Sequence, residues 1–339
     1  MKRLILLSLV LIIGCSQDAE KLSFTELEVD DASLIISAEV MPELGRPFRI
    51  KAESDGFLLY DAGAQKLIKF DFDGNKLFSF GGEGRGPGEF QIVSGFWKFD
   101  DFYMVYDYNS AKFITYDHYG DLLEEIFIEP KEFPSSFPVQ IQAITPHQFA
   151  IPTLGENESL LKLIDLKDNY LNYFGNAVGE HVTNRSGEQI RQAIASRRVP
   201  DYMLNYVSVS SNQTGIFSFQ QATAMLEKYT YSGELVWAKN LKVPAIEDLF
   251  ESHFNNNIPF FNYSEDIHAN EEGVAILLQV IEDEPATIVW VPNDGGNINV
   301  VSFPNVKKQQ RSFTIAHNES YVYFVNTQDG EISRATWPL

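Results

Sequence analysis

The chain has 339 residues, of which 13% are aromatic and 44% hydrophobic, and its formal net charge at pH 7 is −21. Such a charge argues against a protein that holds nucleic acid or anionic lipid headgroups by its overall charge, because both would repel it. The single cysteine excludes an intramolecular disulfide framework and a site built from several thiolates. We therefore expect the folded part to be stabilised by its hydrophobic core.

The N-terminus has the pattern of an export signal. The sequence begins with Met-Lys-Arg, and the apolar run from Leu4 to Ile13 is too short to cross a membrane as a mature helix. The run ends at Gly14 and Cys15, a junction that resembles the lipobox of bacterial lipoproteins. That resemblance implies cleavage before Cys15 and acylation of Cys15. Because cleavage removes both N-terminal basic residues, the net charge of the mature chain becomes −23.

These features predict three segments. We expect a signal peptide over residues 1–14, a lipid-anchored acidic tether over residues 15–30, and a folded domain over residues 31–339. No Asp follows the cysteine directly, so the familiar signal for retention in the inner membrane is missing. The expected location is the cell envelope of a Gram-negative bacterium, as an outer membrane lipoprotein that faces the periplasm or the cell surface.

Short repeated units follow along the chain. Each unit is a polar turn that leads into a short apolar strand, as in Asp-Gly-Phe-Leu-Leu-Tyr-Asp at its first occurrence. The six units lie at residues 55–61, 101–107, 147–151, 214–219, 272–277 and 319–324. Units one, two and four continue with a third strand, a second polar turn and a fourth strand, which together make a propeller blade.

The repeats predict an all-β fold, a six-bladed β-propeller with four-stranded antiparallel blades. The last unit supplies only three strands before the sequence ends at Leu339. We expect a strand from the N-terminal part, either Leu22 to Val29 or Ser33 to Val40, to complete the last blade. This pairing closes the ring and removes an exposed sheet edge.

The first unit also has a family resemblance. Residues 56–61, 66–71 and 73–81 resemble an NHL-type repeat, and residues 84–90 are similar to the Gly-Pro-Gly-Glu-Phe element of six-bladed propeller lipoproteins from Gram-negative bacteria. The resemblance implies the fold and says little about function, because propellers host many activities.

The motif loop of that family comprises Gly84, Arg85, Gly86, Pro87 and Gly88. A phosphate-binding loop would need a helix directly after it. We interpret this loop instead as a crossing between two blades, since the residues after it are typical of another strand.

The sequence shows no recognisable catalytic set. Of the six histidines only His268 is expected on an inner strand, and no Gly-x-Ser-x-Gly motif occurs. We therefore expect no metal, no cofactor and no enzymatic activity. The alternative is a propeller lyase or hydrolase that holds a metal in its central funnel.

Two long connections interrupt the repeats. The first, residues 180–202, contains a capping box and a short amphipathic pattern that predict a helix. The second, residues 244–260, begins at Pro244 and also predicts a helical turn. Because outer-to-inner connections of antiparallel blades all emerge on the same face, both segments and the glycine-rich loop belong to one face.

The same topology predicts a binding site on that face. Polar residues near the starts of the inner strands would encircle a funnel: Arg49, Gln140, Tyr206, Asp266 and Arg311. Arg191 and Arg197 would lie on its rim. Guanidinium groups bind carboxylates in a bidentate way, so we expect an anionic ligand on a protein, peptide or glycan partner. The alternative is that these arginines neutralise neighbouring carboxylates. The expected protein is a monomer that does not bind nucleic acid and contacts the membrane through its anchor alone.

The lipid anchor can be tested directly. Cys15→Ala removes the only thiol available for acylation, so the variant should lose fatty-acid labelling and remain uncleaved at this site. Metabolic labelling with a fatty-acid analogue and membrane fractionation measure both effects. A variant that still labels and fractionates with membranes as the wild type does would contradict the lipobox interpretation.

Overall fold

The computed structural model describes residues 23–37, 39–128, 141–168, 170–179, 187–258, 263–279, 285–306, 309–316 and 319–339. The predictions for the signal peptide, the anchor cysteine Cys15 and the funnel residue Gln140 lie outside the described residues. So do residues 180–186 and 259–260 of the two long connections.

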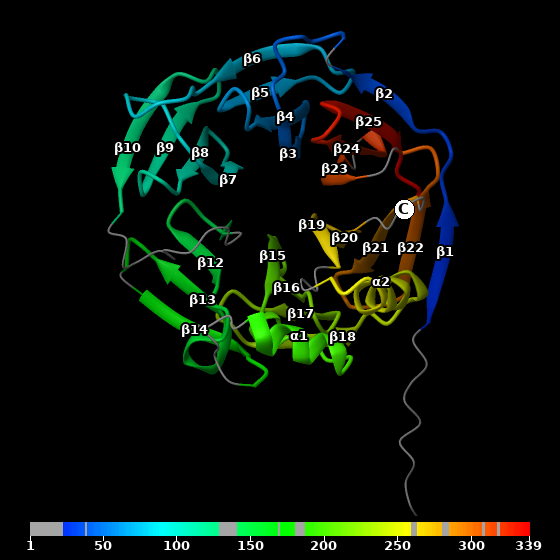
Figure 1. The fold of residues 1–339 in the computed structure, drawn as a ribbon. Helices are drawn as coiled ribbons and strands as arrows, with labels where there is room; N and C mark the ends of the chain where they lie inside the picture. The colour runs from blue at the N-terminus through cyan, green and yellow to red at the C-terminus, as the bar shows by residue number, and fades with distance from the viewer. Residues whose placement is uncertain are drawn as a thin grey trace, which may run out of the picture.

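The described strands form six sheets around a common axis (Figure 1), which confirms the predicted six-bladed β-propeller. Blade one holds β3 (Pro47–Glu53), β4 (Gly56–Asp61), β5 (Lys66–Phe70) and β6 (Lys76–Phe80). Blade two holds β7 (Val93–Lys98), β8 (Phe102–Asp107), β9 (Lys112–Asp117) and β10 (Leu122–Phe127). Blade three holds β11 (Gln142–Ala143), β12 (Gln148–Pro152), β13 (Ser159–Asp165) and β14 (Tyr170–Asn176).

Blade four holds β15 (Val207–Asn212), β16 (Gly215–Gln220), β17 (Met225–Tyr229) and β18 (Leu235–Asn240). Blade five holds β19 (Ser264–Ala269), β20 (Gly273–Leu278), β21 (Ala286–Pro292), β22 (Ile298–Phe303) and the added strand β1 (Phe24–Glu28). Blade six holds β23 (Gln310–Ala316), β24 (Tyr321–Asn326), β25 (Glu331–Thr336) and β2 (Ser33–Ile36). Two short 3₁₀ helices, Glu156–Glu158 and Asp201–Met203, lie in connections.

Burial follows the position of a strand within its blade. The second strands β4, β16 and β20 are buried at every residue, because both of their faces pack against neighbouring blades. The outer strands β6 and β10 expose most of their residues. The core is therefore a set of hydrophobic clusters between adjacent blades rather than one central mass, and this leaves the axis for polar residues.

The N-terminal segment closes the ring, and it does so with β2. Ser33 pairs with Arg334 and Ile36 with Ile332, so β2 is the antiparallel outer strand of the last blade. The second of the two predicted segments, Ser33 to Val40, is thus the one that completes blade six. The first, Leu22 to Val29, does not, because β1 pairs in parallel with β22 on the neighbouring blade. Since β1 lies within residues 15–30, the expected tether overlaps the folded domain.

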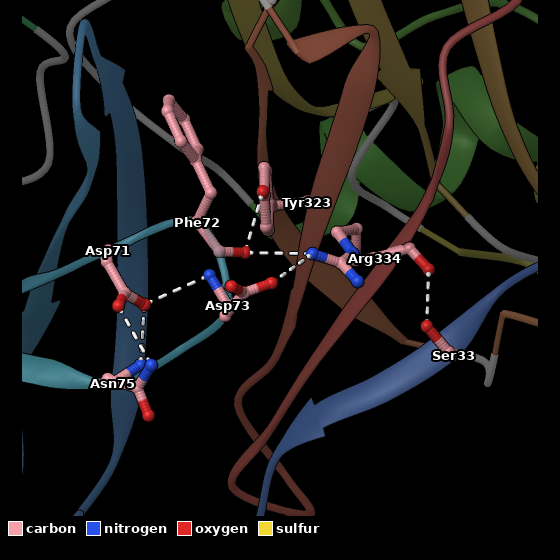
Figure 2. A network of polar contacts seen from close by, with 7 residues as sticks. All are labelled: Ser33, Asp71, Phe72, Asp73, Asn75, Tyr323 and Arg334. Carbon is pink, nitrogen blue, oxygen red and sulfur yellow. Dashed lines mark hydrogen bonds and ion pairs between the residues drawn. The ribbon is translucent and has the colours of Figure 1, made fainter.

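Polar contacts reinforce the junction between the last and first blades (Figure 2). The guanidinium of Arg334 donates to the carbonyl oxygen of Phe72 at 3.0 Å and to a carboxylate oxygen of Asp73 at 3.2 Å. The hydroxyl of Tyr323 donates to the same carbonyl at 3.0 Å. Asp71 holds this turn of blade one by accepting the backbone N–H of Asp73 at 3.0 Å. Side chains from two strands of blade six therefore hydrogen-bond to one turn of blade one.

The two long connections contain the predicted helices, α1 (Gly187–Ala195) and α2 (Pro244–Asn255). In α1, Ala193 and Ile194 are buried, as the amphipathic pattern predicts. In α2, Pro244 stands at the first helical turn, where its missing N–H costs nothing. None of the helices in the described ranges is long and apolar enough to cross a membrane.

Closure by β2 predicts unequal costs for two substitutions in the same strand. Ile36 is 1% exposed within the core cluster between blades six and one, whereas Leu34 is 51% exposed. Ile36→Ala should lower the free energy of unfolding by about 2–5 kcal/mol, and Leu34→Ala by less than about 0.5 kcal/mol. Urea denaturation of both variants measures the difference. Equal, small effects would contradict the role of β2 in the core.

Candidate functional site

A cavity of about 410 Å³ lies on the axis of the ring, and all six inner strands line it. This volume is within the range of small-molecule sites, which is about 300–1000 Å³. Each inner strand starts on the face that carries α1, α2 and the glycine-rich loop. The cavity therefore runs from that face toward the face with the short turns.

Hydrogen bonds between neighbouring inner strands fix the wall of this cavity. Hydroxyl groups of one strand accept backbone N–H groups of the next, with donor–acceptor distances between 2.8 and 3.3 Å. The pairs are Ser312 with Ile50, Thr314 with Ala52, and Ser210 with Ala269. These side chains link adjacent blades, so the cavity is held in one shape before any ligand arrives.

A β-bulge recurs at the same place in four inner strands. The register shifts at the second residue of β3, β7, β19 and β23, where two residues oppose one residue of the partner strand. Beyond the bulge, the third residue of each strand lines the cavity: Arg49, Gly95, Asp266 and Ser312. The bulge thus selects which residue of each strand faces the axis.

Arg49 and Asp266 place opposite charges at this level of the cavity. The guanidinium of Arg49 donates to the carbonyl oxygen of Ser94 at 3.0 Å. The hydroxyl of Ser312 donates to one carboxylate oxygen of Asp266, and the backbone N–H of Ile267 donates to the other at 2.9 Å. Burial raises the pKa of Asp266, while Arg49 and these hydrogen bonds oppose the rise.

Lys51 lies two residues further along β3 and also lines the cavity. Its ammonium lies 5.4 Å from the ring centre of Phe96 and 5.5 Å from that of Trp97, within the range of cation–π contacts. Burial, together with the nearby charge of Arg49, lowers the pKa of Lys51 from 10.5 to about 8, while Asp266 opposes the shift. Lys51 is not among the funnel residues predicted from the sequence. Its signal is the alternation Arg-Ile-Lys, which places residues 49 and 51 on the same side of a strand.

The structure brings together two of the predicted funnel residues. Arg49 and Asp266 line the cavity, whereas Tyr206 is partly buried against the core cluster of blades four and five. Arg311 occupies the bulged second position of β23 and does not line the cavity. It contacts Glu265, the bulged residue of β19, at 2.8 Å, and remains 52% exposed. Ser312 takes the cavity position that the sequence pattern assigned to Arg311.

One of the two predicted rim arginines forms an ion pair within the protein. Arg197 contacts Glu251 of α2 at 2.6 Å and lies 5.2 Å from the ring centre of Phe254. Arg197 therefore joins the two long connections, as the intramolecular alternative predicts. Arg191 is exposed on α1, and it does not line the axial cavity.

The glycine-rich loop connects β6 with β7 and is held by structural contacts. The hydroxyl of Tyr116 donates to the carbonyl oxygen of Gly88 at 2.7 Å, and the N–H of Gly88 donates to Glu125 at 3.2 Å. Phe90 is completely buried. A side chain at Gly81 would lie 2.3 Å from the ring of Phe90, so glycine is needed there. None of these loop residues lines the axial cavity.

The histidines do not assemble a metal site in the part of the chain that the structure describes. There, no group of three or more His, Cys, Asp or Glu side chains is placed to hold a metal ion. His268 lines the cavity, as its predicted place on an inner strand requires, and its ring lies 6.1 Å from that of Phe313.

Comparisons with known proteins support the fold. The chain is similar to a putative exported protein from Bacteroides fragilis, with a TM-score of 0.52 and 14% identity over 93% of this chain and 94% of that one. It is similar to a DUF4221 family member from Bacteroides vulgatus, with a TM-score of 0.54 and 10% identity over 93% and 95% of the chains. A luciferin-regenerating enzyme gives a TM-score of 0.51 and 10% identity over 87% and 94%. No protein-family model matches the chain, and no curated protein matches it at a significant level.

The lowered pKa of Lys51 predicts a pH dependence of stability. Between the folded pKa of about 8 and the unfolded pKa of 10.5, the unfolded state binds more protons than the folded state. Stability of the wild type relative to Lys51→Met should therefore rise by roughly 1.5 kcal/mol between pH 8 and pH 9.5.

Urea unfolding of both proteins across this pH window measures the rise. Lys98→Met is the matched control, because Lys98 lines the far end of the same cavity and is exposed. Its stability difference from the wild type should stay constant. If the free energies of unfolding of the wild type and Lys51→Met changed with pH in parallel, the assigned environment of Lys51 would be wrong.

Proposed function

We propose that this protein is an exported binding module whose ligand occupies the axial cavity. The observation that carries the proposal is the combination of charged and aromatic side chains inside a preformed cavity, with Arg49, Lys51, Asp266 and Trp97 all in its lining. Charged groups in such a place are expensive for folding, since they lose part of their hydration. Ligand binding gives a reason for keeping them there.

The composition of the cavity wall favours a role of the axial residues in ligand binding over a role in stabilising the fold alone. Both faces of each blade are already filled by the hydrophobic clusters between blades, so the axial residues add little apolar burial. Small-molecule sites typically combine aromatic walls with a few convergent polar groups. The axial cavity has this composition, and no catalytic step is part of the proposal.

The cell envelope is the proposed location. The support comes from the export-signal pattern before Cys15 and from a similar structure that is described as a putative exported protein. Anchoring through acylated Cys15 would hold an acidic domain on a membrane that otherwise repels it. The face of the propeller that carries α1, α2 and the glycine-rich loop would then be available to a ligand outside the cytoplasm.

Filling the cavity tests the site. Ser211 is a partly buried cavity residue of β15, and a larger side chain there would occupy the axis. Compounds from a small-molecule library that raise the melting temperature of the wild type should leave Ser211→Trp unchanged. Differential scanning fluorimetry with the same compounds measures this.

Ser79→Trp is the matched control, because Ser79 is exposed on the outer strand β6 and far from the axis by its place in the blade. This variant should respond to the compounds as the wild type does. Compounds that stabilise Ser211→Trp as strongly as the wild type would place the site elsewhere and overturn the proposal.

A further inference from the structure

We infer that the axial cavity selects a ligand with a carboxylate on an aromatic or apolar body, and that Lys51 and Arg49 bind the carboxylate. The inference rests on the proposed binding function and names the ligand class of that site. It differs from the sequence-based hypothesis of an arginine rim, because Arg197 and Arg311 are engaged with Glu251 and Glu265.

The charge of the lining is positive, although the whole chain is strongly negative. Three basic residues line the cavity, namely Arg49, Lys51 and Lys98, and two acidic residues, Glu53 and Asp266. Glu53 is engaged outside the axis, since its carboxylate lies 2.6 Å from the ammonium of buried Lys69. With Glu53 paired to Lys69, three basic residues of the lining face Asp266 alone, so a negative charge on a ligand would reduce the excess positive charge around the axis.

The two cations nearest the middle of the cavity retain donors for a ligand. In the described part of the chain, the ammonium of Lys51 has aromatic neighbours and makes no hydrogen bond or ion pair. Arg49 donates to the carbonyl of Ser94 through one nitrogen, and a guanidinium carries five N–H donors in all. An ammonium and a guanidinium two residues apart on one strand can both donate to the same carboxylate.

Asp266 offsets only one of the two positive charges of Arg49 and Lys51, so a net positive charge remains for an anion. One of its carboxylate oxygens accepts from Ser312 and the other from the backbone of Ile267, so both are engaged by the protein. Phe96 and Trp97, which are buried in the clusters between blades, line the cavity beside Lys51 and supply part of its apolar wall. A ligand with an aromatic body could lie against these rings while its carboxylate reaches Lys51.

Phenylacetate and phenylacetamide are suitable probes, because they share an aromatic body and differ in charge. Ligand-observed NMR titration at pH 7 should show that the wild type binds phenylacetate about tenfold or more tightly than phenylacetamide. Lys51→Met should remove this preference. Lys51→Arg keeps the charge and should restore it, and Lys66→Met, at an exposed position of β5 that does not line the cavity, should retain it.

The outcomes separate this inference from the proposed function. Equal binding of the two probes by the wild type, or an unchanged preference in Lys51→Met, would overturn the carboxylate selection while leaving a ligand in the cavity. Failure of both probes to bind at millimolar concentration would also overturn the selection. Binding of phenylacetate by Ser211→Trp with wild-type affinity would instead show that the axial cavity is not the site, and both proposals would fall.

Discussion

The antiparallel pairing of β2 with β25 joins the N-terminal segment to the last blade and closes the ring. Without it, β25 would be an unpaired edge and the cluster between blades six and one would lose Ile36. Arg334 and Tyr323 add hydrogen bonds to the turn of blade one (Figure 2). The axial cavity exists only because six inner strands face one another, so its geometry depends on this closure.

The repeated bulges explain how a regular scaffold carries an irregular site. Each bulge lets the first residue of an inner strand pair with the end of its neighbour, and then turns the third residue toward the axis. On blade one that residue is Arg49, on blade five it is Asp266, and on blade six it is Ser312. Four blades share this backbone feature but present different chemistry, which is how a propeller acquires specificity without a change of fold.

Much of the fold was predictable from local pattern. Turn residues and apolar alternation marked the six blades, and the capping box and Pro244 marked α1 and α2, because these signals depend on neighbours in the sequence. The site was only partly predictable. A bulge changes which side chain faces the axis, and nothing in the sequence around Arg311 reveals it. Likewise, the contacts of Arg197 with Glu251 depend on two long connections meeting in space.

The central claim is that a carboxylate ligand binds in the axial cavity beside Lys51. A crystal structure of the protein soaked with para-bromophenylacetate, with anomalous data collected for bromine, tests it most directly. The account predicts a bromine peak within the cavity near Phe96 and Trp97, and the carboxylate within hydrogen-bonding distance of Lys51 or Arg49. A bromine peak outside the axis, or a ligand whose carboxylate points away from both cations, would contradict it.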